Sequence, residues 1–156
     1  MKYNLEQAQK YMKEALKEAA HAYALGEVPI GCVIVKDGQI IGRGFNYREY
    51  SQSALDHAEV RAIEDANHYL NSWRLNDTAL FVTLEPCLMC TGAIVNARIP
   101  EVYYGAADIK AGMAGTLANL LNDRRLNHRA EIQKGILQTE SLELLQKFFN
   151  NIRNKG

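Results

Sequence analysis

Hydrophobic positions change their spacing along the chain, and these changes outline the first expected elements. Between Leu5 and Leu25 apolar residues recur at helical spacing, and Gly26 follows as a stop, so this pattern predicts an amphipathic helix. Residues 28 to 35 are almost continuously apolar, Asp37-Gly38 is a signal for a tight turn, and residues 39 to 44 resume a strand pattern. The sequence therefore predicts a β-hairpin after the first helix.

The rest of the chain alternates between helix and strand patterns. The expected elements, in order, are a helix over residues 57 to 69, a strand over 79 to 83, a helix beginning at Pro86, a strand over 101 to 105, a glycine-rich stretch over 105 to 115, a short helix over 117 to 121, a strand over 131 to 134 and a helix over 141 to 153. Because helices and strands alternate, we expect a mixed five-stranded sheet with helices on both faces, in a three-layer α/β/α sandwich.

Length and composition set limits on this picture. A chain of 156 residues with 47% hydrophobic residues is expected to form a single domain over residues 1 to 156. No apolar run approaches the roughly 18 residues needed to cross a bilayer, and the first segment is charged and amphipathic, so we expect a cytoplasmic protein without a membrane partner. The net charge is zero, which disfavours nucleic-acid binding by bulk attraction, although residues 111 to 156 carry 7 basic and 4 acidic side chains.

Cysteine spacing supplies the first chemical signal. Three cysteines without a secretion signal argue against a disulfide framework. Cys87 and Cys90 stand three residues apart at the start of a predicted helix, so both sulfurs can face one ion. His57 begins another predicted helix, and zinc favours thiolate and imidazole ligands. We therefore expect a zinc site with three protein ligands and one position left for water.

Glu59 follows the candidate histidine ligand by two residues, close enough to reach a metal-bound water but poorly placed to be a fourth ligand. Its expected role is general acid and base. Other interpretations remain open: Cys87 and Cys90 could be a redox pair or half of a structural zinc site, which Cys32 could close. Cys32 lies within an apolar strand pattern, where a small thiol is ordinary core filling.

His57-Ala58-Glu59 together with Pro86-Cys87-Leu88-Met89-Cys90 resembles the signature of the zinc nucleoside and nucleobase deaminases. The resemblance extends along nearly the whole chain, and the chain is similar to the bacterial tRNA adenosine deaminases. It is carried further by residues 27 to 31, 73 to 75, 83 to 90, 97 to 99, 127 to 129 and 148 to 149. It implies a cytidine deaminase-like fold.

The family resemblance also implies an activity and a set of roles. Members convert the wobble adenosine of a tRNA anticodon to inosine, with one zinc ion per chain. By resemblance, the zinc ligands are His57, Cys87 and Cys90, and Glu59 carries protons between water, N1 of adenine and the departing amine. The positions that match substrate contacts are Asn46 and Ala58 for the flipped nucleoside, and Asp108, Lys110, Asn127, Phe149 and Arg153 for the anticodon stem-loop. Family members also pair as homodimers.

Two other functions are compatible with the same motif. One is deamination of a free base or nucleoside, such as cytosine, guanine or adenosine, on the same fold. The other is a non-enzymatic zinc-stabilised RNA-binding module, against which Glu59 argues, since a structural site needs no extra carboxylate. The chain departs from the family pattern at Asp56, where a small or apolar residue is usual, and before Asp108, where a second polar residue is often found.

Overall fold

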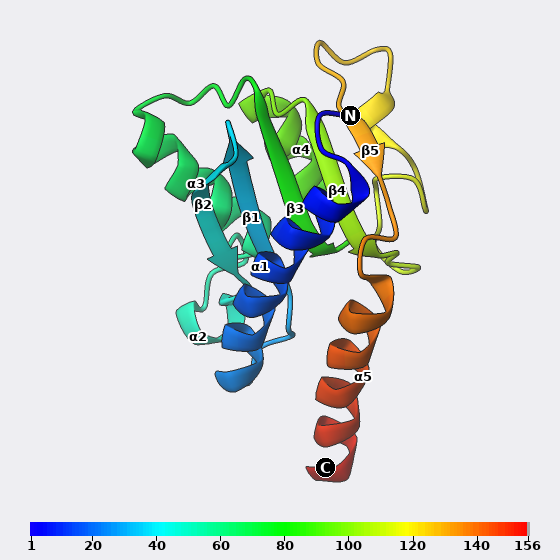
Figure 1. Cartoon of the computed structure of the whole chain (residues 1–156). Coiled ribbons are helices and arrows are strands. Elements are labelled where there is room, and N and C mark those ends of the chain that lie inside the picture. The colour runs from blue at the N-terminus through cyan, green and yellow to red at the C-terminus, as the bar shows by residue number, and fades with distance from the viewer. Residues whose placement is uncertain (156) are drawn as a thin grey trace.

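A five-stranded mixed sheet with helices on both faces organises the chain, as Figure 1 shows for the computed structural model. The structure describes residues 1–155. Its elements are α1 (Leu5–Ala24), β1 (Gly31–Lys36), β2 (Gln39–Phe45), α2 (Arg48–Ser51), α3 (Ala58–Leu70), β3 (Thr78–Leu84), α4 (Leu88–Ala97), β4 (Glu101–Ala106), the 3-10 helix η1 (Leu120–Asn122), β5 (Glu131–Gln133) and α5 (Gln138–Lys155). The expected fold class is confirmed.

The strand order is β2-β1-β3-β4-β5, so the hairpin forms one side of the sheet. β1 pairs antiparallel with both β2 and β3, whereas β3, β4 and β5 run parallel to one another. The hairpin turn has positive φ at Asp37 (50°) and Gly38 (77°), which matches the twist of the two strands it joins. α4 connects the parallel strands β3 and β4, as a crossover helix must.

Alternate side chains of the strands enter two separate cores. Cys32 and Ile34 of β1 pack with α3 and α4 on one face, while Val33 and Val35 pack with α1 on the other. On the α1 face, the rings of Phe81 and Tyr103 stack at 4.4 Å between centroids. Figure 1 shows α1 and α5 on the near side of the sheet and α3 and α4 behind it. The sheet is therefore buried on both faces, which explains the nearly continuous apolar strand segments.

Several predicted boundaries were wrong. The first strand begins at Gly31, not residue 28, because Pro29 has no N–H to donate and Ile30 N instead donates to Val28 O at 2.9 Å. The helix predicted to begin at Pro86 is α4, which begins two residues later, at Leu88. The short helix expected over 117 to 121 is the 3-10 turn η1, and α5 begins three residues earlier than predicted. The sequence pattern gave no sign of α2.

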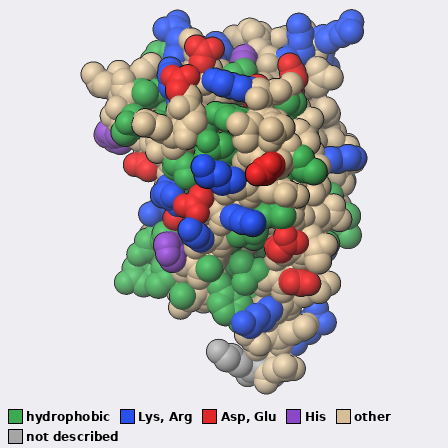
Figure 2. Space-filling model, viewed as in Figure 1, with side chains coloured by type: hydrophobic (Ala, Val, Ile, Leu, Met, Phe, Trp, Pro, Cys, Tyr) green, Lys and Arg blue, Asp and Glu red, His purple; other side chains and the backbone are tan. Residues whose placement is uncertain are grey.

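The face that carries α1 shows Lys and Arg side chains interspersed with Asp and Glu (Figure 2). This mixture agrees with the zero net charge of the chain. Among residues 1–155, no helix combines the length and the hydropathy that crossing a bilayer requires.

Candidate metal centre and substrate pocket

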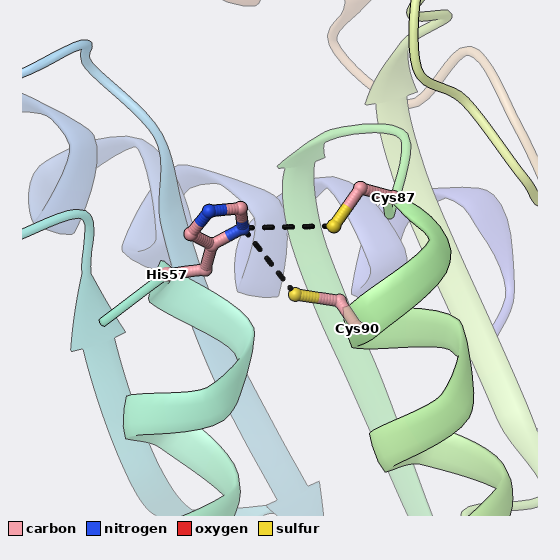
Figure 3. A group of neighbouring side chains, drawn as sticks. All are labelled: His57, Cys87 and Cys90. Atoms are coloured by element: carbon pink, nitrogen blue, oxygen red, sulfur yellow. Dashed lines mark hydrogen bonds between the residues drawn. The ribbon is translucent and has the colours of Figure 1, made fainter. Parts of the chain in front are cut away.

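The N-termini of α3 and α4, on the sheet face opposite α1, converge and bring three ligand side chains together (Figure 3). His57 is the N-cap of α3, and Cys87 is the N-cap of α4, whose first turn also contains Cys90. His57 Nδ1 lies 3.6 Å from Sγ of Cys87 and 3.6 Å from Sγ of Cys90. His57 lies 30 positions from Cys87 and 33 from Cys90 in the sequence, yet the three residues form a group that could hold a metal ion.

The spacing of these ligand atoms fits zinc. A tetrahedral ion with Zn–S bonds of about 2.3 Å and Zn–N bonds of about 2.05 Å places sulfur and nitrogen ligands roughly 3.6 Å apart. Both Sγ···Nδ1 distances have this value. Two sulfurs and one imidazole are also donor types that bind zinc, whereas calcium and magnesium prefer oxygen ligands. The residues present therefore fit a zinc ion with three protein ligands.

The backbone at both helix starts favours anionic ligands. Neither His57 nor Cys87 uses its side chain to cap its helix, although their carbonyls already accept from Arg61 N and Thr91 N in the first turn. Free N–H groups of both first turns, and the positive ends of both helix dipoles, therefore face the ligand group. This field stabilises thiolates, which are the form of cysteine that binds metal.

Hydrogen bonding within the ligand group shifts its acid–base properties. A hydrogen bond from Cys90, followed in importance by one from His57, lowers the pKa of Cys87 to about 3. The pKa of Cys90 is raised because its proton is shared with Cys87 and because its thiol is buried. The hydrogen bond to Cys87 raises the pKa of His57. These hydrogen bonds thus favour the thiolate form of Cys87.

Glu59 lies in the first turn of α3 and is only 4% exposed. Burial raises the pKa of its carboxyl to about 7, and the neighbouring negative Cys87 acts in the same direction. Glu59 is not part of the metal-ligand group, yet Glu59 lines the same pocket as His57 and Cys87. A buried carboxylate in that position can exchange protons with a molecule bound beside the metal.

The pocket beside the ligand group has a volume of about 450 Å³, within the range of small-molecule sites. Asn46, 6% exposed, lines it and is held by donating to Val28 O at 3.2 Å and by accepting from Arg48 N at 3.3 Å. The other candidate substrate contacts that line the pocket are Ala58, Asp108, Lys110 and Phe149. Phe149 comes from α5 and remains 43% exposed.

The structure does not bring every candidate residue to the pocket. Asn127, in the segment before β5, and Arg153, in the last turns of α5, are exposed and lie outside the pocket lining. Asp56 is not in the pocket lining and forms an ion pair with Arg61, with 3.6 Å between its Oδ2 and Nη1 of the arginine. Cys32 is fully buried in the sheet core and is not part of the ligand group, so it packs as a core residue.

Several pocket residues had no assigned role in the sequence-based interpretation. Leu142 and Leu145 of α5 line the pocket together with Arg48, which belongs to the unpredicted helix α2. Glu85 also lines the pocket and is 2% exposed. A carboxylate between a buried strand and the Pro-Cys of the ligand motif is a usable sequence signal, because an unpaired charge is seldom buried.

Comparison with known proteins supports the assignment that the geometry suggests. Residues 6–153 match the family model of MafB19-like deaminases. A tRNA-specific adenosine deaminase of Streptococcus pyogenes serotype M18 is 52% identical, over 99% of this chain and 98% of its own length. The tRNA-specific adenosine deaminase of Bacillus subtilis is 48% identical, over 97% and 94% of the two chains.

Two solved structures of deaminases are also similar to this chain. A structure from a study of A-to-I editing by tRNA:A34 deaminases superposes with a TM-score of 0.83 at 38% identity, covering 86% of this chain and 98% of the other. A guanine deaminase from Nitrosomonas europaea superposes with a TM-score of 0.78 at 20% identity, covering 90% and 83% of the two chains, which shows the shared fold alone. With its ligand group, its buried glutamate and these similarities over nearly the full length, the chain belongs to the tRNA-specific adenosine deaminase family.

Proposed function

We propose that this protein hydrolyses the C6 amino group of the wobble adenosine in a tRNA anticodon, leaving inosine and releasing ammonia, and that residues 1–156 form one deaminase domain. The position of Glu59 supports this function most directly. It is buried next to a cysteine and histidine ligand group but is not part of it, and it lines one pocket together with His57 and Cys87. A structural metal site has no use for such a carboxylate, whereas a hydrolytic site needs one.

We assign one zinc ion per chain to His57, Cys87 and Cys90, whose atoms have the spacing of tetrahedral ligands. Bound zinc supplies a Lewis acid that lowers the pKa of a water molecule toward neutrality. The two cysteines hold the ion as thiolates, and the helix N-termini at His57 and Cys87 stabilise that negative charge.

Glu59 moves the protons of the reaction. Water adds its oxygen to C6 of adenine, and the bond from C6 to the amino nitrogen breaks. The carboxylate of Glu59 first accepts a proton from the water and delivers it to N1. It then carries the second proton from the new C6 oxygen to the amine, which departs as ammonia. A group with pKa near the working pH is suited to both directions of transfer.

Asn46 and Ala58 hold the flipped nucleoside in this proposal. One N–H of the Asn46 amide and one lone pair of Oδ1 are committed to neighbouring backbone, which fixes the orientation of the side chain. The second N–H and the second lone pair remain for the substrate. The backbone N–H of Ala58 lies in the first turn of α3, where helical amides have no intrahelical partner.

Side chains around the pocket would hold the rest of the anticodon loop. Asp108 and Lys110 lie on one loop of the pocket lining, and Phe149 offers an exposed ring on which an unpaired base can stack. Asn127 and Arg153, which are exposed outside the pocket, would contact nucleotides farther from the reacting base. The basic excess of residues 111–156 suits these contacts.

The substrate assignment is tested by incubating the purified protein with an anticodon stem-loop that carries adenosine at the wobble position. Matched samples contain the same stem-loop with guanosine at that position, free adenosine, free cytosine or free guanine. We expect inosine only from the adenosine stem-loop, with ammonia released in equal amount. Ammonia from a free base or nucleoside, with no conversion of the stem-loop, would show that the enzyme belongs to the free-base branch of this fold.

We also propose that the protein acts as a homodimer in the cytoplasm. The dimer rests on the family resemblance. Leu55 and Leu88, which lie within two residues of His57 and Cys87 in the sequence, also have side chains that are 61% and 62% accessible and that a second copy would cover. The cytoplasm is where a tRNA substrate is available. Light scattering on the purified chain tests the dimer, and a monomer mass at working concentration would contradict it.

A further inference from the structure

Glu85 is a buried carboxylate that the proposed proton transfers do not use. It follows β3 directly, is 2% exposed, and precedes Pro86 and the ligand Cys87. Burying a carboxylate costs several kcal/mol unless hydrogen bonds compensate it. The partners of Glu85 therefore indicate what its charge is for.

All side-chain partners of Glu85 come from one loop, residues 107–116, which follows β4. Its Oε1 accepts from Asp108 N at 3.1 Å, and its Oε2 accepts from Ala114 N at 3.0 Å and Thr116 N at 3.1 Å. The hydroxyl of Thr116 also donates to Oε1. Four donors, three of them backbone amides, thus surround one carboxylate, and such charge-assisted hydrogen bonds are the stronger kind.

The loop wraps the carboxylate closely and leaves no spare room. A Cβ on Gly112 would lie 2.4 Å from the carboxyl carbon of Glu85 and 2.4 Å from its Oε1. The backbone of the same strand end adds two further bonds, from Glu85 N to Ala106 O at 2.8 Å and from Met113 N to Pro86 O at 2.9 Å. Both the start and the end of the loop are therefore attached to residues 85 and 86.

This loop also forms one side of the substrate pocket. Residues 107 to 111 line the pocket, and they include the candidate substrate contacts Asp108 and Lys110. The loop contains no named helix or strand, so the hydrogen bonds to Glu85, together with the burial of Ala114, attach it to the end of β3. Only Pro86 separates Glu85 from Cys87, which connects the loop to the metal ligands through a short stretch of backbone.

We propose that Glu85 is a positioning residue that fixes the substrate loop 107–116 relative to the metal ligands, and through Asp108 and Lys110 sets the affinity for the RNA substrate. This role rests on the proposed function, since it concerns the same pocket. Glu85 acts through the loop and does not contact the reacting base. Its loss affects binding of the nucleic acid more than the chemical step.

The test is the variant Glu85→Gln, which keeps the size of the side chain but turns an amide NH₂ toward backbone donors. We expect KM for the adenosine stem-loop to rise at least ~10-fold while kcat changes by less than ~3-fold, the pattern of lost uniform binding. Hydrogen exchange at the amides of Asp108, Ala114 and Thr116 is expected to accelerate at least ~10-fold. Zinc content and exchange in β1 and β3 are expected to stay as in the parent protein.

Two further variants reach the same loop without changing the charge. Gly112→Ala pushes the loop off the carboxylate and is expected to reproduce both effects of Glu85→Gln, whereas Thr116→Val removes only the hydroxyl donor and is expected to give a smaller rise in KM. The matched control is Glu101→Gln. Glu101 also accepts hydrogen bonds, from Lys2 N and the Tyr103 hydroxyl, but at the opposite end of β4 from the pocket.

A merely structural role for Glu85 predicts a different outcome. The variant would then unfold at lower temperature without a selective change in KM or in exchange at the loop amides, and this result would overturn the proposal. The exchange measurement needs no substrate. If the parent protein did not convert the stem-loop, the proposed function would fail, while unchanged loop exchange in Glu85→Gln and Gly112→Ala would separately refute the positioning role.

Discussion

Gly44 of β2 lies directly under Ala58, the first residue of α3, so closely that a Cβ on the glycine would come within 2.4 Å of the Ala58 carbonyl oxygen. The same Cβ would lie 2.7 Å from Ala62 N. The missing side chain therefore lets α3 approach the sheet. Because α3 carries His57 and Glu59 at its start, this contact sets the height of both above the strands.

Replacing Gly44 with alanine is expected to lift the start of α3. Overpacking of this kind costs on the order of 1–3 kcal/mol in the free energy of unfolding. We also expect weaker zinc binding, because the histidine ligand moves relative to the two sulfurs. Thermal unfolding and zinc titration measure these effects. Gly92→Ala is the matched control: its Cβ would meet nothing within 4 Å on α4, so it should leave zinc affinity unchanged and stabilise the helix by up to about 1 kcal/mol.

Glu59→Ala is expected to keep about one zinc ion per chain and to lower kcat at least ~100-fold, the contribution of a positioned general acid and base. Glu59 is not among the ligand atoms, which is why the metal remains. Single-turnover deamination of the stem-loop, with metal analysis of the same sample, measures both. The control is Glu64→Ala, an exposed glutamate on the same helix, which should turn over normally. Normal activity in Glu59→Ala would remove the proposed proton carrier.

The cysteines are expected to divide into two classes. Cys90→Ala should lose the metal, because two protein ligands cannot hold zinc tightly, and its activity should fall below detection. Cys32→Ala should retain one zinc ion per chain and lose only about 1 kcal/mol of stability, since Cys32 is a fully buried core residue. Metal analysis after dialysis distinguishes them. Loss of zinc from Cys32→Ala would instead point to a closed structural site.

Neighbouring phenylalanines on α5 are expected to have different roles. Phe149 lines the pocket and is 43% exposed, so Phe149→Ala should weaken binding of the stem-loop by roughly 5- to 100-fold, as loss of base stacking does. Phe148 is 7% exposed, and Phe148→Ala should mainly lower stability, by about 3 kcal/mol. RNA titration and thermal unfolding separate these effects. Ile152→Ala, at an exposed position of α5, is the control, and equal RNA affinity in Phe149→Ala would exclude stacking on that ring.

An ion pair between α1 and β2 is expected to contribute to acid sensitivity. Hydrogen bonds from Lys17 and Arg43 lower the pKa of Glu14 below its ordinary value of about 4.5, and Arg43 Nη2 lies 2.7 Å from Glu14 Oε1. Because the folded-state pKa is lowered, the pair stabilises the fold above pH 4.5, and this contribution is lost as pH falls through the folded-state pKa. It amounts to less than about 1 kcal/mol at this partly exposed site.

The corresponding variant is Arg43→Met. Its free energy of unfolding should fall less steeply than that of the parent protein below pH 4.5, and the difference should shrink in 1 M salt. Urea unfolding between pH 3 and 6 measures the slope. Identical slopes for the two proteins would mean that Arg43 does not stabilise the ionised form of Glu14.

The sequence by itself determined the local elements and the candidate residues of the site. His57, Glu59, Cys87 and Cys90 follow from short-range spacing at two helix starts, and the hairpin follows from Asp37-Gly38, because these features depend on residues within a few positions of one another. The alternation of helix and strand patterns also indicated the layered mixed sheet.

Tertiary structure decided what depends on contacts between distant segments. It placed β1 between β2 and β3, joined two helix starts thirty residues apart, and folded the loop 107–116 back onto Glu85. It also brought Phe149 to the pocket while leaving Asn127 outside it. Local hydrophobic spacing records which face of an element is buried, but not which element covers it, so these relationships follow only from the packed fold.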